Sequence, residues 1–166
     1  HRRQRQMCIR DRYNYYSVDK AKNSNLKHRP VGMGVMGFQD ALYKIRVPYE
    51  SEEAVDFADK SMEYVSYFAI EASMELAKER GAYESFDGSL WSQGILPIDS
   101  LRKLKKIRGK YLDVNLDESL KWDELRDKIK ANGMRNSNTL AIAPTATISN
   151  ICGVSQSIEP TYQNLY

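Results

Sequence analysis

The feature that most limits the fold of this chain is one long amphipathic stretch, residues 52–80. Its apolar side chains recur at alternating spacings of three and four, which places them on one face of an α-helix. They are Val55, Ala58, Met62, Val65, Ala69, Ala72 and Leu76. Ser51 is a suitable N-cap and Gly81 a natural stop. A helix of about 40 Å is long for a chain of this size, which indicates that its packing partner lies elsewhere.

The same periodicity predicts two shorter helices. One covers residues 31–45, with apolar side chains at spacings of four and three, and Pro48 follows it. The other covers residues 119–132, is built on Trp122, Leu125 and Ile129, and ends at Gly133. We therefore expect the chain to be mostly helical.

The segments between these helices predict other structures. Residues 13–30 are polar and are expected to be a connection, and residues 81–97 an ordered loop packed by Tyr83, Phe86 and Trp91. The basic residues of the stretch 101–110 are expected to form a solvated face. Residues 139–143 are apolar, partly β-branched and followed by Pro144, a pattern typical of a short buried strand.

Composition excludes several classes of protein. Hydrophobic residues make up 42% and charged residues 28% of the chain, which is typical of a soluble globular protein. A net charge of only +3, which falls further when the arginines of the first twelve residues are discounted, argues against direct binding of nucleic acid. No apolar run is long enough to span a membrane. The two cysteines, Cys8 and Cys152, form no ligand or redox motif and suit a reducing cytoplasm.

The first twelve residues differ in character from the rest. They carry five arginines, lack periodicity and contain the string RQMCIRD, which looks like translated adapter sequence. We expect residues 1–12 to be a non-native leader and residues 13–166 to belong to one partial domain. A basic arm that contacts anionic partners is the alternative interpretation.

One dinucleotide-binding pattern is present, but the secondary structure that should surround it is not predicted. Gly32, Gly34 and Gly37 match G-x-G-x-x-G, and Asp56 lies near the distance expected of a ribose-binding acid. The motif requires a buried strand before it and a βαβ unit around it, whereas residues 27–30 are polar and end in a proline. The glycines are better explained as a close approach of this predicted helix to a neighbour.

A second candidate site follows the predicted strand. Residues 144–149, Pro-Thr-Ala-Thr-Ile-Ser, join the strand to a possible helix start, where free backbone N–H groups and hydroxyls can bind an anion. A plain connection in which Thr147 or Ser149 is the helix N-cap uses the same residues, and the pattern alone favours it.

The sequence gives little support for a metal site or for a nucleophilic catalytic site. His28 is the only histidine outside the leader, so neither a histidine-based metal site nor a Ser/His/Asp arrangement can be built. Cys152 is expected to be a buried structural thiol.

Two strings carry a resemblance to a known family. Residues 28–43, HRPVGMGVMGFQDALY, and residues 135–166, RNSNTLAIAPTATISNICGVSQSIEPTYQNLY, resemble segments of the large (alpha) subunit of class I, aerobic ribonucleotide reductases, in the same order. The likeness covers about residues 13–166. It implies an α/β fold, part of the ten-stranded α/β barrel of that family.

The resemblance also implies a role for the second candidate site. In the family, the loop after a barrel strand holds the diphosphate of the ribonucleotide. By position this loop comprises Pro144, Thr145, Ala146, Thr147 and Ile148, flanked by Ser149. With the resemblance taken into account, we prefer a phosphate-binding loop over a plain connection for residues 144–149.

The family chemistry reduces ribonucleoside diphosphates to 2′-deoxyribonucleoside diphosphates by a thiyl-radical mechanism. Its catalytic cysteines belong before Tyr13 and its radical-path tyrosines after Tyr166, so we expect no catalytic residue, no metal and no bound cofactor in this chain, which would be inactive alone.

Further expectations come with the family. The parent enzyme takes its radical from a metal-containing small (beta) subunit and responds to dNTP and ATP effectors. Thioredoxin or glutaredoxin and a second large subunit are its other partners. The alternatives are an adenosylcobalamin-dependent (class II) reductase and a non-catalytic helical interaction module.

Overall fold

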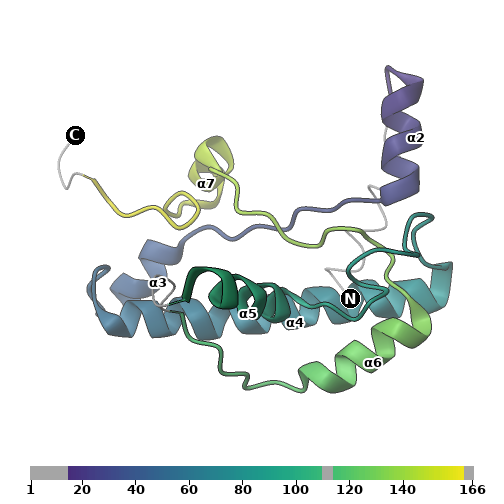
Figure 1. Ribbon diagram of the computed structural model, residues 1–166. Coiled ribbons are helices and arrows are strands. Elements are labelled where there is room, and N and C mark those ends of the chain that lie inside the picture. Colours follow the sequence, from purple (N-terminus) through teal and green to yellow (C-terminus); the bar gives the residue numbers. More distant parts are fainter. Residues whose placement is uncertain (1–14, 110–113, 163–166) are drawn as a thin grey trace. The chain divides into compact units, whose positions relative to one another are not determined.

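The chain is described from a computed structural model, which describes residues 15–109 and 114–162 (Figure 1). The predicted leader, residues 1–12 with Cys8, lies outside these ranges. The helices run in the order α2 (Asp19–His28), α3 (Phe38–Ile45), α4 (Glu52–Arg80), α5 (Pro97–Arg108), α6 (Trp122–Asn132) and α7 (Ala146–Cys152). The predominantly helical character of the described residues is confirmed.

Helix α4 has the bounds that its apolar periodicity predicts. The Ser51 hydroxyl accepts a hydrogen bond from the Ala54 N–H at 3.2 Å, so Ser51 is the N-cap. At the other end, Gly81 adopts a φ of +80°, and its N–H bonds to the Ala77 carbonyl at 2.8 Å. Ser51 and Gly81 therefore begin and end the helix as predicted.

The chain forms two compact units. Unit 1 comprises His1–Val31 and Val65–Thr139, and unit 2 comprises Gly32–Tyr64 and Leu140–Tyr166. Helix α4 contributes its first part to unit 2 and its remainder to unit 1.

Unit 1 contains the larger core. Side chains from α4, from the loop after it and from α6 pack together, and Tyr67 stacks edge-on against Trp122 with ring centroids 5.2 Å apart. The buried members are Tyr67, Ile70, Met74, Tyr83, Leu96, Trp122, Leu125, Ile129 and Met134. The three residues on which the helix 119–132 was predicted, Trp122, Leu125 and Ile129, are all buried, although α6 begins only at Trp122.

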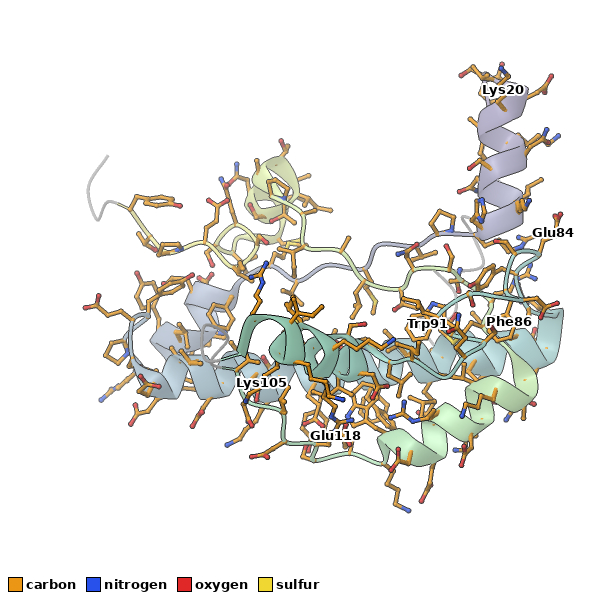
Figure 2. The ribbon with its side chains drawn as sticks, in the orientation of Figure 1. Lys20, Glu84, Phe86, Trp91, Lys105 and Glu118 are labelled. Carbon is orange, nitrogen blue, oxygen red and sulfur yellow. The ribbon has the colours of Figure 1, made fainter. Side chains whose placement is uncertain are left out.

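The aromatic loop between α4 and α5 is ordered as predicted. Tyr83 is buried, and Phe86 and Trp91 pack against the core (Figure 2). The Trp91 indole N–H donates to the Ser137 carbonyl at 2.9 Å, which ties the loop to the segment after α6. Most of the predicted basic face is exposed, as seen at Lys103, Lys105, Lys106 and Arg108. Arg102 is only partly exposed, and Lys110 lies outside the described residues.

Unit 2 is organised around two extended segments and α3. Met33 and Leu140 form a parallel β-bridge, and the Ala141 N–H donates to the Met33 carbonyl at 3.2 Å. A Cβ on Gly32 would lie 2.9 Å from the Ala141 Cβ, and one on Gly34 would lie 2.9 Å from the Ala141 oxygen. The predicted close approach of these glycines is thus real. It occurs in an extended segment, so the prediction that they lie in a helix is wrong.

Three other predictions about elements are wrong. Residues 13–30 are not simply a connection, because α2 covers Asp19–His28; it buries no residue, so it has no apolar stripe to detect. The helix expected over residues 31–45 begins at Phe38, after Gly37 in the left-handed region. Residues 139–143 form no strand: their single bridge is not a ladder, and Ile142 is 55% exposed.

Candidate functional site

The 144–149 loop leads directly into α7. Thr145 adopts the left-handed conformation, with φ +52° and ψ +26°, and Ala146 is the first helical residue. The first helical hydrogen bond runs from the Ser149 N–H to the Thr145 carbonyl at 3.0 Å. The amides of Ala146, Thr147 and Ile148 therefore precede the helical hydrogen-bonding pattern, and within the described residues they donate to no acceptor.

The side chains of the loop divide into an outer and an inner set. Pro144, Ala146, Thr147 and Ile148 are exposed. Ser149 is fully buried, and its hydroxyl donates to the Ala146 carbonyl at 3.3 Å. The structure thus presents the first part of the predicted site to solvent and turns its last residue inward.

Two predictions about this region are wrong. Thr147 and Ser149 are not the N-cap of α7, because the left-handed Thr145 starts the helix two residues earlier than Thr147. Cys152 is exposed rather than buried. It is the last residue of α7, where the chain turns at Gly153 and no described segment covers it.

The loop is anchored to the chain that follows α7. The Ser157 N–H donates to the Thr145 hydroxyl oxygen at 2.8 Å. Ser157 itself has a φ of +42°, so the two residues joined by this bond both adopt the left-handed region. Side chains other than glycine seldom adopt this conformation, and it persists only where surrounding contacts hold it.

The chain after α7 is held in turn by the start of α3. The Ser155 N–H donates to Asp40 Oδ2 at 2.6 Å, and the Gly37 N–H donates to the Ser155 carbonyl at 2.9 Å. The neighbouring Ser155 hydroxyl and this N–H lower the pKa of Asp40 below its ordinary value of 3.8. Of the two groups, only the N–H reaches full hydrogen-bond distance, since the buried Ser155 hydroxyl has no partner among the described residues.

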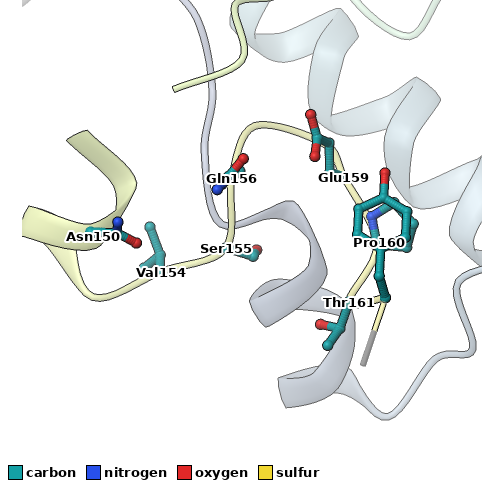
Figure 3. A pocket seen from close by; sticks show the side chains of 8 residues that line it. Asn150, Val154, Ser155, Gln156, Glu159, Pro160 and Thr161 are labelled. Atoms are coloured by element: carbon teal, nitrogen blue, oxygen red, sulfur yellow. The ribbon is translucent and has the colours of Figure 1, made fainter. Parts of the chain in front are cut away.

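A pocket of about 330 Å³ opens beside this segment (Figure 3). It is lined by Asn150, Val154, Ser155, Gln156, Glu159, Pro160, Thr161 and Tyr162. None of residues 144–149 lines it. The pocket and the predicted anion loop are therefore separate features of unit 2.

The sequence that contains the loop carries almost no charge, which is unusual for an anion site. From residue 136 to the end of the sequence, Glu159 is the only charged residue. An anion at the loop would therefore depend on backbone N–H groups and hydroxyls. Among the described residues there is also no group of three or more His, Cys, Asp or Glu side chains that could hold a metal ion.

Sequence reasoning missed Asp40, Ser155 and Ser157. The Asp40–Ser155 contact joins residues 115 positions apart, and no local pattern signals it.

The sequence was expected to contain no membrane-spanning segment. In the described ranges, no helix is both long enough and apolar enough to cross a bilayer.

Comparison with known proteins gives a consistent result. The family described as "Ribonucleotide reductase, barrel domain" matches residues 7–166. The ribonucleoside-diphosphate reductase subunit alpha of Chlamydia muridarum (strain MoPn / Nigg) is 55% identical over 155 residues, covering 92% of this chain and 15% of that protein.

Relatives with lower identity carry the same kind of name. The large subunit of Plasmodium falciparum (isolate Dd2) is 45% identical and the large chain of Schizosaccharomyces pombe (strain 972 / ATCC 24843) 41% identical. Each match covers 92% of this chain and 18% of the relative, so the chain spans less than a fifth of these relatives.

These matches confirm the resemblance on which the family was predicted. They favour neither the adenosylcobalamin-dependent class nor a non-catalytic helical module. The chain belongs to the ribonucleotide reductase barrel-domain family, and the proteins it matches are large, or alpha, subunits of ribonucleoside-diphosphate reductases.

Proposed function

We propose that this chain is part of a large subunit that reduces ribonucleoside diphosphates to 2′-deoxyribonucleoside diphosphates. In this proposal residues 144–149 bind the diphosphate of the substrate. The observation that carries it is the run of three adjacent, unpaired amides at Ala146, Thr147 and Ile148, exposed at the start of α7. Such amides, with the positive end of the helix dipole, favour a phosphate group.

The individual residues have different parts in this proposal. Thr145 sets the direction of the amides by its left-handed conformation, and Thr147 adds an exposed hydroxyl. Ser149 flanks the site and stabilises the first turn of α7 from inside. Pro144 fixes the backbone that enters the loop.

The chain contributes binding and orientation rather than bond-breaking. The diphosphate is remote from the ribose carbon that loses its hydroxyl, so contacts with it can hold the ribose in place for a thiyl radical supplied by another part of the subunit. We assign no catalytic residue, metal or cofactor to this chain. It would be inactive by itself.

The wider assembly belongs to the same proposal. We infer a ten-stranded α/β barrel, with the parallel bridge between Met33 and Leu140 as one contact of its sheet. The apolar side chains left exposed here, such as Ile142 and Ile151, would be covered by the rest of that domain.

The partners follow from the same family. They are a small (beta) subunit whose metal site generates the radical, thioredoxin or glutaredoxin as reductant, a second large subunit, and dNTP or ATP effectors. A cytoplasmic location suits all of them.

Replacement of Thr147 by proline in the full-length subunit tests the loop assignment. Proline removes one of the three free N–H groups, and the first turn of a helix tolerates it because those N–H groups have no helical acceptor. We expect KM for the diphosphate substrate to rise about tenfold or more, as for the loss of one hydrogen bond to a charged group. Effector binding should be nearly unchanged.

Two controls separate the contributions. Thr147→Ala removes only the hydroxyl, so its effect on KM should be smaller than that of Thr147→Pro. Glu53→Ala changes an exposed side chain near the start of α4, in the same unit, that the proposal does not use. An unchanged KM and kcat in Thr147→Pro would refute the assignment.

A further inference from the structure

A set of hydrogen bonds connects the start of α3 to the loop at the start of α7. It begins at Asp40, which accepts from the Ser155 N–H, and it ends at Thr145, which accepts from the Ser157 N–H. Two backbone bonds hold the same segment, from Gly37 N–H to the Ser155 carbonyl at 2.9 Å and from Phe38 N–H to the Ser157 carbonyl at 3.4 Å. All these residues belong to unit 2.

The consequence is that residues 155–157 have little freedom relative to α3. Gly37 adopts a φ of +78°, and a Cβ placed on it would lie 3.2 Å from the Val154 Cβ, so the two backbones are closely packed. Ser157 is 2% exposed, and its left-handed conformation needs external support. Two side chains contribute to this support: Asp40 accepts from the Ser155 N–H, and the Tyr49 hydroxyl donates to the Ile158 carbonyl at 2.8 Å.

Thr145 is the residue through which this support reaches the loop. Its φ of +52° determines where the amides of Ala146 and Thr147 point, and its hydroxyl oxygen is bound by the Ser157 N–H. If residues 155–157 shifted, that hydrogen bond would be lost. Thr145 could then relax toward a conformation that side chains prefer.

We propose that Asp40 is a positioning residue for the anion loop: its carboxylate fixes residues 155–157, which hold Thr145 in the conformation that presents the α7 amides. Asp40 does not touch the substrate in this role. The inference rests on the proposed binding of a diphosphate by residues 144–149.

The electrostatics of Asp40 suit the role. Hydrogen bonding from Ser155 keeps the carboxylate ionised by lowering its pKa, and Lys44 on the same helix acts in the same direction. A charged acceptor makes a stronger hydrogen bond to a backbone N–H than a neutral one. A carboxylate is therefore a firmer anchor than a serine or asparagine would be at this position.

The test uses the full-length subunit with ribonucleoside diphosphate as substrate. Asp40→Ala removes the acceptor, and we expect KM to rise about five- to tenfold, the scale of one lost hydrogen bond, while kcat at saturating substrate changes less than about twofold. Asp40→Asn keeps a side-chain oxygen as acceptor but loses the charge, so its KM should lie between those of the wild type and Asp40→Ala. Asp56→Ala is the matched control, because it removes an exposed carboxylate from the α4 part of the same unit.

A double-mutant cycle separates positioning from general destabilisation. Thr145→Val removes the hydroxyl oxygen that accepts from the Ser157 N–H and keeps the shape of the side chain. Thr145→Ser keeps the hydroxyl. If both ends act through residues 155–157, the KM effects of Asp40→Ala and Thr145→Val will be less than additive. Independent losses of stability would add.

Each result is decisive. A KM within about twofold of the wild-type value in Asp40→Ala, or additive effects in the cycle, overturns the inference. If Asp40→Ala does not fold, Thr145→Val decides: an unchanged KM in that variant overturns the inference, and a raised KM that Thr145→Ser restores supports it. If Thr147→Pro alone raises KM, the loop assignment stands and only the role of Asp40 fails. If Thr147→Pro has no effect, the proposed function itself fails.

Discussion

Asn136 is a buried polar residue that connects three segments of unit 1. Its amide oxygen accepts from the Ser73 hydroxyl at 2.9 Å, its backbone N–H donates to the same hydroxyl oxygen at 3.0 Å, and its side-chain NH₂ donates to the Arg29 carbonyl at 2.9 Å. Asn136 and Ser73 are both fully buried. One side chain thus joins α4, the end of α2 and the segment after α6.

Replacing Asn136 by alanine should destabilise the protein strongly. The Ser73 hydroxyl and the Arg29 carbonyl would lose partners in places that water does not easily reach, at a cost of about 2–4 kcal/mol in the free energy of unfolding. Denaturant unfolding of the full-length protein measures this. Asn138→Ala, at an exposed position nearby, should cost less than about 0.5 kcal/mol. Equal effects of the two substitutions would contradict the account.

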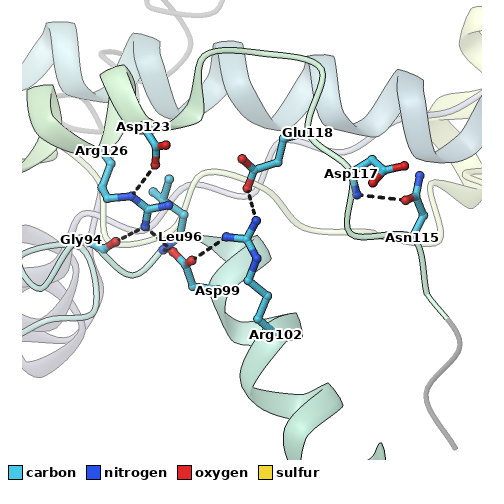
Figure 4. Close-up of polar contacts among 9 residues, drawn as sticks. All are labelled: Gly94, Leu96, Asp99, Arg102, Asn115, Asp117, Glu118, Asp123 and Arg126. Atoms are coloured by element: carbon cyan, nitrogen blue, oxygen red, sulfur yellow. Dashed lines mark hydrogen bonds and ion pairs between the residues drawn. The ribbon is translucent and has the colours of Figure 1, made fainter. Parts of the chain in front are cut away.

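At the scale of elements, the Asp99 carboxylate joins α5 to α6 by an ion pair with Arg126 (Figure 4). Asp99 accepts from the Arg126 guanidinium, from the Leu96 N–H at 2.9 Å and from Arg102 at 3.2 Å. Arg126 also donates to the Gly94 carbonyl at 2.6 Å. Burial raises the pKa of Asp99, but the hydrogen bonds from Arg126, Leu96 and Arg102 outweigh it, and the pKa is lowered.

The lowered pKa of Asp99 predicts a pH dependence with a definite sign. A carboxyl group whose pKa is lower in the folded than in the unfolded state stabilises the fold above the ordinary pKa, here 3.8, and that stabilisation is lost as the pH falls toward the folded pKa. Asp99→Asn should therefore lower the unfolding midpoint at neutral pH by an amount that shrinks below pH 3.8. Asp87→Asn, at an exposed loop position, should change the unfolding midpoint at neutral pH much less than Asp99→Asn does. A difference between wild type and Asp99→Asn that grows on acidification would contradict this.

Helices that bury one apolar face could be predicted from the sequence. Elements without a buried face could not be predicted in this way. In α6, Leu125 and Ile129 are buried as their helical spacing requires. In α4 the predicted apolar stripe is buried only in part, because Ala69 and Leu76 are buried whereas Val55 is 61% exposed. Helix α2 buries nothing, so its polar sequence looks like that of a connection. Residues 139–143 have the composition of a strand, but a strand also needs hydrogen-bonded neighbours, and one bridge to Met33 is too little.

The position of the proposed site is a prediction from the sequence, whereas the contacts that hold the loop could not be predicted from it. The string Pro-Thr-Ala-Thr-Ile-Ser marks the loop, and the family resemblance gives it a ligand. The left-handed conformation of Thr145 and its bond to Ser157 depend on contacts between distant segments. The link from Asp40 is more distant still, so only a three-dimensional structure can reveal it.

At the scale of the whole molecule, the two units have different tasks in this account. Unit 1 is a packed core of helices and aromatic side chains with no proposed ligand. Unit 2 contains both the proposed diphosphate loop and the residues that hold it in place. The chain spans only 15% to 18% of the relatives compared above, so the reducing chemistry would belong to the remainder of the subunit.

The central claim is that the backbone amides at the start of α7 bind the substrate diphosphate. A structure of the full-length subunit with a ribonucleoside diphosphate bound tests it most directly. The account predicts phosphate oxygens within roughly 2.7–3.2 Å of at least two of the amide nitrogens of Ala146, Thr147 and Ile148. A diphosphate bound by other residues, with these three amides still open to solvent, would contradict it.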